Sequence, residues 1–209
     1  MSAALTLMQW LSPAFPVGAF AYSHGLEQVI ADGTITDAAS LQDYLQTLLA
    51  HGSGRADAIL LAAAHTTDDV PHVDATARAF AASAERLKET DLQGAAFCDT
   101  ARAVWGLDIS GLTYPVAVGT ATRAMAIPVS DTLPLYLHAF ASNLVSVAQR
   151  AMPLGQTDGQ TVLAALAPTI ADTAAKAETT SLDTLTSTSF AADIAAMRHE
   201  TLQPRIFRT

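Results

Sequence analysis

The sequence predicts an all-α protein, a single-domain bundle of about eight to ten helices followed by a C-terminal docking tail. Half of the 209 residues are hydrophobic, and no stretch alternates between apolar and polar residues over the length of a strand. Apolar residues recur instead at three- and four-residue spacings, which is the period of a helix with one buried face. A chain of this length can bury a large core within one domain.

Proline and glycine residues mark the ends of the expected helices. Pro13 and Pro16 lack an amide donor and end the first helix. Gly25 lies inside the second helix, where it costs about 1 kcal/mol relative to alanine, so we expect something to pack closely against it. The expected helices span residues 5–11, 19–32, 36–50, 57–65, 74–105, 114–127, 131–152, 157–170 and 190–197.

Two of these helices have distinctive patterns. The helix over 131–152 is apolar on most of its faces, which predicts a place at the centre of the bundle. The helix over 74–105 carries a charged cluster in its middle, and we expect a solvated face with pairs at i and i+4. The cluster consists of Glu85, Arg86, Lys88, Glu89 and Asp91.

The last third of the chain contains the expected division into parts. Thr157 and Gln160 have the spacing of a capping box, and Pro168 is expected to strain the helix behind them. Residues 179–189 are rich in Ser and Thr and predict a linker between a helical bundle over 1–178 and a segment over 190–209. That segment contains a short amphipathic helix and the C-terminal tail, residues 201–209. Basic and apolar residues alternate over 205–208 of the tail.

Composition excludes several classes of function. The net charge of −9 argues against nucleic acid and disfavours anionic membranes. The single cysteine, Cys98, excludes a disulfide scaffold and a cysteine-rich metal site. No Lys or Arg precedes Arg55 and no apolar run approaches the length of a membrane span, so we expect a cytoplasmic protein with neither a signal peptide nor a membrane anchor.

Motifs for catalysis or cofactor binding are absent from the sequence. It contains no phosphate-binding loop, no dinucleotide fingerprint and no nucleophile elbow. The six histidines form no i, i+4 pair of the kind that a helical metal site needs. We therefore expect no cofactor, no metal site and no enzymatic activity, and interpret the chain as a protein that acts by binding.

Residues 12–27 (SPAFPVGAFAYSHGLE) combine prolines, glycines and aromatic side chains in one corner of the chain. One interpretation is a plain turn between helices with aromatic core residues. The other is a docking surface with Tyr22, Ser23 and His24 exposed. Asn143 needs a hydrogen-bond partner, either within the structure or in a polar cavity.

Three stretches occur in an order that identifies a family: residues 12–27, residues 143–160 (NLVSVAQRAMPLGQTDGQ) and residues 197–209 (MRHETLQPRIFRT). The chain resembles the urease accessory protein F family over essentially its full length. The segment before Pro204 and the pair after Arg150 depart from the family's usual residues, which affects only the fine geometry of the tail.

The resemblance implies an all-α, homodimeric nickel-insertion chaperone. It also implies that the protein binds the urease accessory protein D (also called H), and that this complex recruits and regulates the GTPase accessory protein G to deliver nickel to apo-urease. Independently of the resemblance, the apolar composition favours a homodimer, because one compact bundle would otherwise expose a large patch.

We assign partner binding to the corner and the tail. The candidate residues are Phe20, Tyr22, Ser23, His24, Glu27, His199, Glu200, Arg205, Ile206, Phe207 and Arg208. We expect the tail to be loosely held until a partner orders it, whereas the alternative is a tail that packs on its own bundle. Two further hypotheses are a helical enzyme with a polar pocket near Tyr136, His138 and Asn143, and a ligand-binding or structural homodimer with no role in urease maturation.

Overall fold

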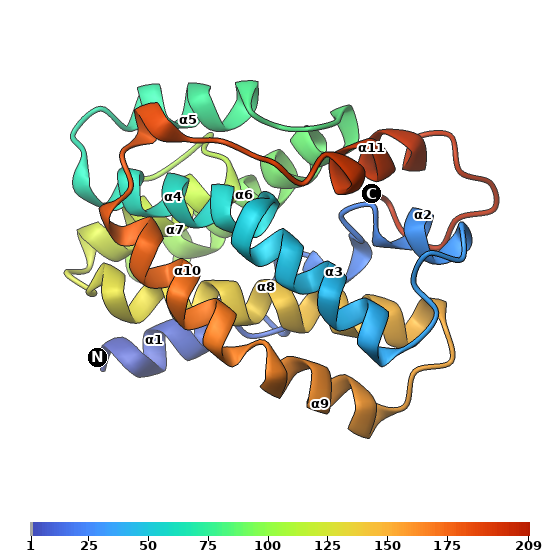
Figure 1. Ribbon diagram of the computed structural model, residues 1–209. Helices are drawn as coiled ribbons and strands as arrows, with labels where there is room; N and C mark the ends of the chain where they lie inside the picture. The colour runs from blue at the N-terminus through green and yellow to red at the C-terminus, as the bar shows by residue number, and fades with distance from the viewer. Residues whose placement is uncertain (1) are drawn as a thin grey trace.

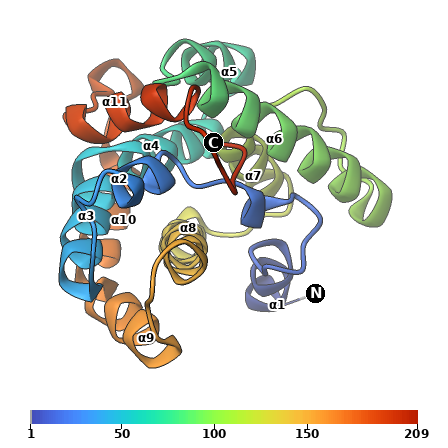
Figure 2. The same cartoon turned by 90° about the vertical axis from the view of Figure 1, so that its right-hand side faces the viewer.

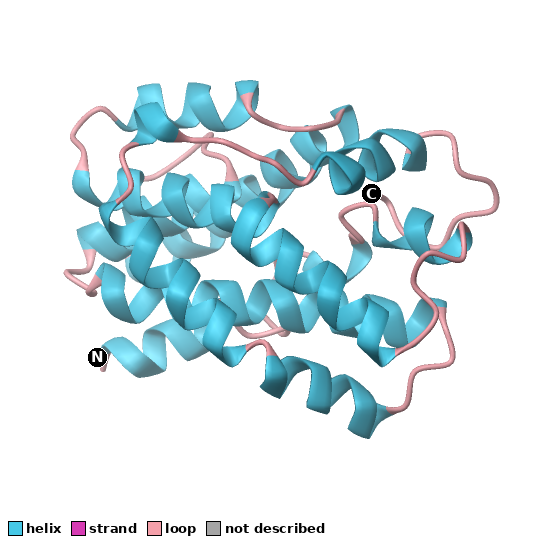
Figure 3. Ribbon diagram, in the orientation of Figure 1, coloured by secondary structure: helices cyan, strands magenta, loops and turns pink. Residues whose placement is uncertain are grey.

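The computed structural model describes residues 2–209, and all of their regular secondary structure is helical (Figure 3). The prediction of an all-α fold is confirmed. Eleven α-helices and two short 3₁₀ helices follow one another in these residues. They are α1 (Ala3–Trp10), η1 (Ala19–Ala21), α2 (Leu26–Ala31), α3 (Ala38–His51), α4 (Ser53–Thr66), α5 (Val70–Ala79), α6 (Ala84–Trp105), α7 (Tyr114–Ala124), α8 (Val129–Ala151), α9 (Gln156–Ala165), α10 (Ala167–Thr179), η2 (Leu182–Thr184) and α11 (Phe190–His199).

The long helix α8 occupies the middle of the bundle, as its apolar faces predict. Seen end-on in Figure 2, it is surrounded by α3, α9 and α10 on one side, α4 and α7 above, and α1 on the other side. Its buried residues include Leu133, Leu137 and Leu144, none of which has any exposed surface. Helix α8 therefore packs against helices from the N-terminal, central and C-terminal parts of the chain.

Two expected helices are broken where local capping chemistry begins a new one. The stretch over 74–105 divides because α5 ends at Ala79 and the Ser83 side chain accepts the amide of Arg86, which starts α6. The stretch over 157–170 divides at Leu166, and Pro168 lies in the first turn of α10, where its missing amide costs nothing. The expected capping box at Thr157 is wrong, because α9 starts one residue earlier with Gly155 as its N-cap.

The stretch over 19–32 also divides, into η1 and α2, and Gly25 explains why. Gly25 has a φ of +78° and precedes the first turn of α2, a conformation that favours glycine. A Cβ atom at this position would lie 2.7 Å from the backbone nitrogen of Ala196 in α11. The expectation of a close contact at Gly25 is confirmed, and this contact lets α11 approach α2.

The segment over 179–189 is attached to the bundle at several points. The guanidinium of Arg55 donates to the carbonyl oxygen of Thr186 at 3.0 Å, and the amide of Thr188 donates to that of His51 at 2.9 Å. Leu185 packs against the core. In Figure 1 this segment leads from α10 across the molecule to α11 and the C-terminus, which lies beside α2. Among residues 2–209, no helix is both long and apolar enough to cross a membrane.

Candidate partner-binding site

The C-terminal tail lies along the N-terminal corner, so the two ends of the chain form one site. The amide of Arg208 donates to the carbonyl oxygen of Ala21 at 2.8 Å, and the amide of Ser23 donates to that of Thr209 at 2.8 Å. Figure 2 shows the red tail passing between α2 and α6 toward the blue corner. The tail therefore pairs with residues 21–23 through its backbone.

Glu27 on α2 is the main acceptor for the tail backbone. Its Oε1 accepts a hydrogen bond from the amide of Ile206 at 2.6 Å, and its Oε2 accepts one from the amide of Phe207 at 3.0 Å and lies 2.9 Å from Nε2 of His199. Burial by itself would raise the pKa of Glu27, but these hydrogen bonds together outweigh burial and hold the pKa below its ordinary value. Glu27 is therefore a buried carboxylate whose charge is stabilised largely by the tail.

Glu85 on α6 binds the tail through side chains. Its Oε2 lies 2.8 Å from Nδ1 of His199, and its Oε1 accepts Nη1 of Arg205 at 2.5 Å. Glu200 adds a contact from the end of α11, where its carboxylate accepts the amide of Ala84 at 3.0 Å. The start of α6 and the tail are thus joined by charge-assisted hydrogen bonds, which are stronger than neutral ones.

Glu89, one turn further along α6, is the centre of a second polar cluster. Its carboxylate lies 2.9 Å from Nε2 of His24 and 3.3 Å from Nη1 of Arg86, and it accepts the hydroxyl of Thr209 at 3.0 Å. Burial would raise the pKa of Glu89, yet the charges of His24 and Arg86 and the hydrogen bonds from His24 and Thr209 together lower it.

The expectation that the charged residues of α6 form a solvated face is wrong. Glu89 is only 1% exposed, and Arg86 reaches inward to Asp57 of α4 at 2.6 Å. The side chains that bind Glu89 and Arg86 come from α4, the corner and the tail, which are distant from them in sequence. These contacts bury residues whose spacing along α6 is typical of a surface.

Phe207 anchors the tail in the core. Its side chain is 3% exposed and belongs to the main hydrophobic cluster. The guanidinium carbon of Arg150, at the end of α8, lies 4.5 Å from the centre of the Phe207 ring, and Nη2 of Arg150 donates to the carbonyl oxygen of Phe20 at 2.7 Å. Arg150 therefore contacts both the tail and the corner.

The eleven candidate residues lie in one region of the molecule, but with mixed exposure. Phe20, Glu200, Arg205, Ile206 and Arg208 are exposed. Tyr22, Ser23, Glu27, His199 and Phe207 are buried, and the His24 side chain is largely covered.

Two expectations need correction. The interpretation of the corner as a docking surface had Tyr22, Ser23 and His24 exposed, whereas Tyr22 and Ser23 are buried and the His24 side chain is largely covered. We also expected a loosely held tail, whereas the tail packs on its own bundle, because Phe207, Thr209 and the backbone amides have partners there. The exposed residues of the site therefore lie over a buried cluster of polar and charged side chains.

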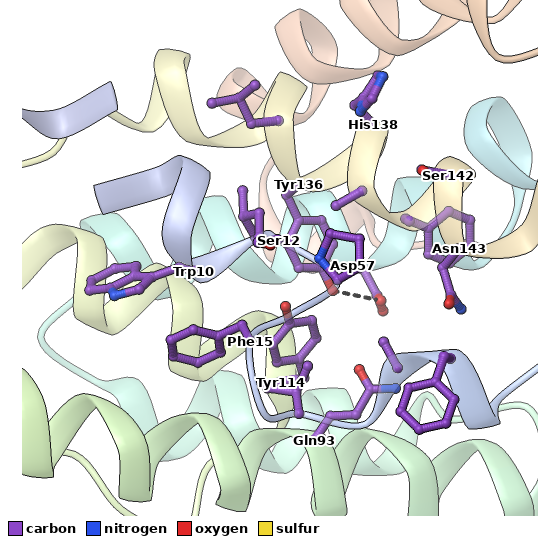
Figure 4. Close-up of a pocket in the computed structure, with 18 of the residues that line it drawn as sticks. Trp10, Ser12, Phe15, Asp57, Gln93, Tyr114, Tyr136, His138, Ser142 and Asn143 are labelled. Carbon is purple, nitrogen blue, oxygen red and sulfur yellow. Dashed lines mark hydrogen bonds between the residues drawn. The ribbon is translucent and has the colours of Figure 1, made fainter. Parts of the chain in front are cut away.

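A cavity of about 320 Å³ lies behind the corner, between α1, α6 and α8. The expected pocket residues Tyr136, His138 and Asn143 all line it (Figure 4). Tyr136 donates to Oδ2 of Asp57 at 3.0 Å, and Asn143 donates to the carbonyl oxygen of Tyr22 at 3.4 Å. Burial raises the pKa of Tyr136 well above its ordinary value, and the nearby Asp57 raises it further.

The acids of this cavity are already paired. Asp57 binds Arg86 and Tyr136, and Glu89 binds His24 and Arg86. Such pairing suits a structural network rather than acid–base chemistry, which needs a group free to exchange its proton with a substrate. Within residues 2–209, no group of three or more His, Cys, Asp or Glu side chains is arranged to hold a metal ion.

Glu85, Glu89 and Arg150 are the site residues that sequence reasoning missed. Glu85 and Glu89 are four residues apart and share one face of α6, a spacing that was visible but is equally typical of a solvated helix. Arg150 ends a long apolar helix, where a cation also suits the helix dipole. Each has a partner 120 or 130 residues away in sequence (Arg205 for Glu85, Thr209 for Glu89 and Phe20 for Arg150), and no local pattern indicates these contacts.

Comparison with known proteins gives the family of the chain. Residues 35–167 match the UreF family model. The chain is 56% identical over 207 residues to the urease accessory protein UreF of Roseobacter denitrificans, covering 98% of this chain and 93% of the relative. It is 54% identical over 210 residues to the urease accessory protein UreF of Cereibacter sphaeroides, and both chains are fully covered. It is 48% identical over 211 residues to the urease accessory protein UreF of Ruegeria pomeroyi, covering 98% of this chain and 96% of the relative. With its helical fold and a site formed by the first and the last of the three stretches that suggested the resemblance, the chain belongs to the UreF family of urease accessory proteins.

Proposed function

We propose that this chain is a non-enzymatic binding subunit of the urease accessory complex. It binds the urease accessory protein D (H), and with it recruits and regulates the GTPase accessory protein G for nickel insertion into apo-urease. It works as a homodimer in the cytoplasm. Membership in a family named for urease accessory proteins supports this role.

The observation that carries the proposal is the composite face of the corner and the tail. Phe20 is 63% exposed and Ile206 is 69% exposed, although both are large and apolar. Arg150 links the two segments, because it bonds to the carbonyl oxygen of Phe20 and stacks on Phe207, which follows Ile206 in the chain. Large apolar side chains that are exposed beside a well-ordered cluster of polar residues are typical of residues that anchor a protein partner.

The tail arginines support a role in holding this face rather than in catalysis by the GTPase. Arg205 is bound to Glu85, and the backbone amide of Arg208 donates to the carbonyl oxygen of Ala21. A catalytic arginine finger would have to leave these partners and reach a bound nucleotide. Replacing each arginine by lysine separates the two roles: collapse of GTP turnover within an intact complex would support the finger.

Self-association is supported by a second apolar surface on α1 and α8. Leu5 and Met8 on α1 are 62% and 65% exposed, and Leu135 on α8 is 39% exposed. A second copy of the chain would cover these side chains. Met8→Asp combined with Leu135→Asp is expected to shift the protein toward monomer in sedimentation at micromolar concentration, whereas an unchanged dimer would place the interface elsewhere.

Partner capture tests the proposal directly. We expect Ile206→Asp and Phe20→Asp to abolish capture of the D-type partner and urease activation while leaving the melting temperature within a few degrees. The matched control is Val104→Asp, because Val104 is 60% exposed on the far end of α6. If both variants capture the partner with wild-type affinity, the composite face is not the binding site. The alternative of a helical dimer without a role in urease maturation then gains support.

A further inference from the structure

His199 lies between two carboxylates without any exposed side-chain surface. Its Nδ1 is 2.8 Å from Oε2 of Glu85, and its Nε2 is 2.9 Å from Oε2 of Glu27. An ionised carboxylate only accepts hydrogen bonds, and a neutral imidazole has a single N–H. Both hydrogen bonds therefore form only when these three groups hold one proton more than a neutral ring and two carboxylates do, either on the ring or on a carboxyl.

The same two carboxylates hold the tail. Glu27 accepts the amides of Ile206 and Phe207, and Glu85 accepts the guanidinium of Arg205. With the additional proton, the positive charges of His199 and Arg205 balance the two carboxylates. Without it, one of these largely buried carboxylates faces a ring nitrogen lone pair, which is strongly unfavourable where water is excluded.

Other charged and titratable groups surround this cluster, and the buried ones have partners of their own. On α6, Glu89 is bound by His24 and Arg86, and on α11 Arg198 binds Asp32 at 3.0 Å. At the ends of the tail, Glu200 accepts the amide of Ala84, and the exposed Arg208 donates its backbone amide to the carbonyl oxygen of Ala21. Lys88 is exposed on the outer face of α6. The proton count at the tail attachment therefore depends on His199 and the two carboxylates that it contacts.

We propose that the C-terminal end of the chain is held by a proton-linked latch, in which attachment of His199 together with residues 200–209 takes up one proton in the group formed by His199, Glu27 and Glu85. Loss of that proton releases the tail and uncovers Phe207 and Ser23. The latch is a property of the isolated chain. Where the proposed function also holds, it controls access to the same partner-binding face.

The sign of the pH dependence follows from this arrangement. The attached state holds the proton and the released state gives it up, so attachment is strongest at low pH and weakens as pH rises. A free imidazole titrates at about pH 6.5. Above the pH at which the released ring is neutral, linkage of one proton weakens attachment by up to about tenfold for each pH unit.

Amide hydrogen exchange in the full-length protein measures attachment directly. Protection factors, which already correct for the intrinsic pH dependence of exchange, are followed for Ile206 and Phe207 by NMR between pH 5.5 and 8.5. We expect them to fall by up to about tenfold for each unit above neutrality. The amide of Leu144 in the core of α8 is the internal reference, and its protection is expected to stay constant.

Two variants identify the group responsible. In Glu85→Gln, the amide NH₂ can donate to Nδ1 of a neutral His199 while Nε2–H still binds Glu27, so the tail stays attached without the extra proton. We expect Glu85→Gln to retain tail protection at pH 8 and to remove its pH dependence. His199→Gln is expected to lower protection at pH 5.5 and also to remove the pH dependence. Glu178→Gln and His72→Gln, both at exposed positions, are the matched controls and keep the wild-type slope.

Three results would overturn the latch. The first is a wild-type protection factor that varies less than twofold across the range. The second is a wild-type slope retained in Glu85→Gln, which remains informative even where His199→Gln fails to fold. The third is a parallel slope at Leu144, because the pH dependence would then belong to unfolding of the whole bundle. Since none of these measurements involves a partner, failure of the latch is distinguishable from failure of the proposed function.

Discussion

The guanidinium of Arg150 covers the ring of Phe207 at 4.5 Å and at the same time donates to the carbonyl oxygen of Phe20. One side chain at the end of α8 therefore fixes both halves of the composite face. A lysine would keep the charge. Its compact ammonium group lacks the planar guanidinium, which can stack on a ring and donate a hydrogen bond in its own plane at the same time.

We therefore expect Arg150→Lys to loosen the tail without unfolding the bundle. Loss of the cation–π contact is worth about 0.5–1 kcal/mol at a partly exposed site, which lowers protection of the Phe207 amide about two- to fivefold. Arg102→Lys is the matched control, because Arg102 also donates to a backbone carbonyl, that of Ile109, but far from the tail. Equal protection in the wild type and Arg150→Lys would mean that Phe207 is held by burial alone.

The buried carboxylates predict how stability depends on acid. The pKa values of Glu27 and Glu89 are lowered in the folded chain, so each contributes stability that is present above the unfolded value of about 4.3 and is lost as pH falls through the folded value. We expect the free energy of unfolding to decline below about pH 4.3, measured by urea titration between pH 3 and 7.

Glu89→Gln tests the share of this acid dependence that Glu89 contributes. Removing one charge from a buried pair typically costs about 3–5 kcal/mol, and we expect the lower end because Arg86 retains Asp57. The variant should also show a shallower decline in stability toward pH 3. A variant as stable as the wild type at pH 7, with an unchanged acid limb, would show that the Glu89 charge is not held by His24 and Arg86.

Much of the fold follows from local patterns, whereas the composition of the site does not. The apolar faces of α8 predict its central position, and the corner and the tail are both recognisable as unusual segments. Their mutual contact joins residues separated by 186 positions, as between Ser23 and Thr209, and nothing in either segment encodes the other's position.

The error at α6 has the same origin. Glu85 and Glu89 have the spacing of a solvated helix face, and only the approach of α11, the corner and the tail makes them buried. The break before α6 was missed for a different reason: neither proline nor glycine occurs between Ala79 and Ala84, and the Ser83 cap is a weak signal by itself.

Gly94 on α6 is expected to be intolerant of a side chain. A Cβ atom there would overlap the carbonyl oxygen of Leu112 and lie 2.8 Å from the carbonyl carbon of Thr113, so the backbone leading into α7 would have to move. Overpacking typically costs about 1–3 kcal/mol, and a rigid backbone obstacle favours the upper part of this range. We expect Gly94→Ala to lower the free energy of unfolding by about 2 kcal/mol in urea titration, despite the better helix propensity of alanine.

Gly159 on α9 is the matched control for Gly94. A Cβ atom at Gly159 would have side-chain atoms as its nearest neighbours, the end of Gln149 and Cγ1 of Val145 at 3.0 Å, rather than backbone atoms. We expect Gly159→Ala to cost much less stability than Gly94→Ala, because side chains can shift and alanine is the better helix former. Equal effects of the two substitutions would contradict close packing of α6 on the chain before α7.

Truncation after Gln203 is expected to lower the melting temperature while preserving the helical far-UV circular dichroism spectrum. It removes the burial of Phe207, worth about 1.5–3 kcal/mol, and two of the hydrogen bonds that compensate the buried Glu27 carboxylate. A chain of this size loses about 2–4 °C for each kcal/mol, so we expect a fall of roughly 3–12 °C. Ile206→Ala is the matched control, because Ile206 is 69% exposed and its loss should leave the melting temperature unchanged. A truncated protein that melts like the wild type would show that the tail adds nothing to the fold and serves binding alone.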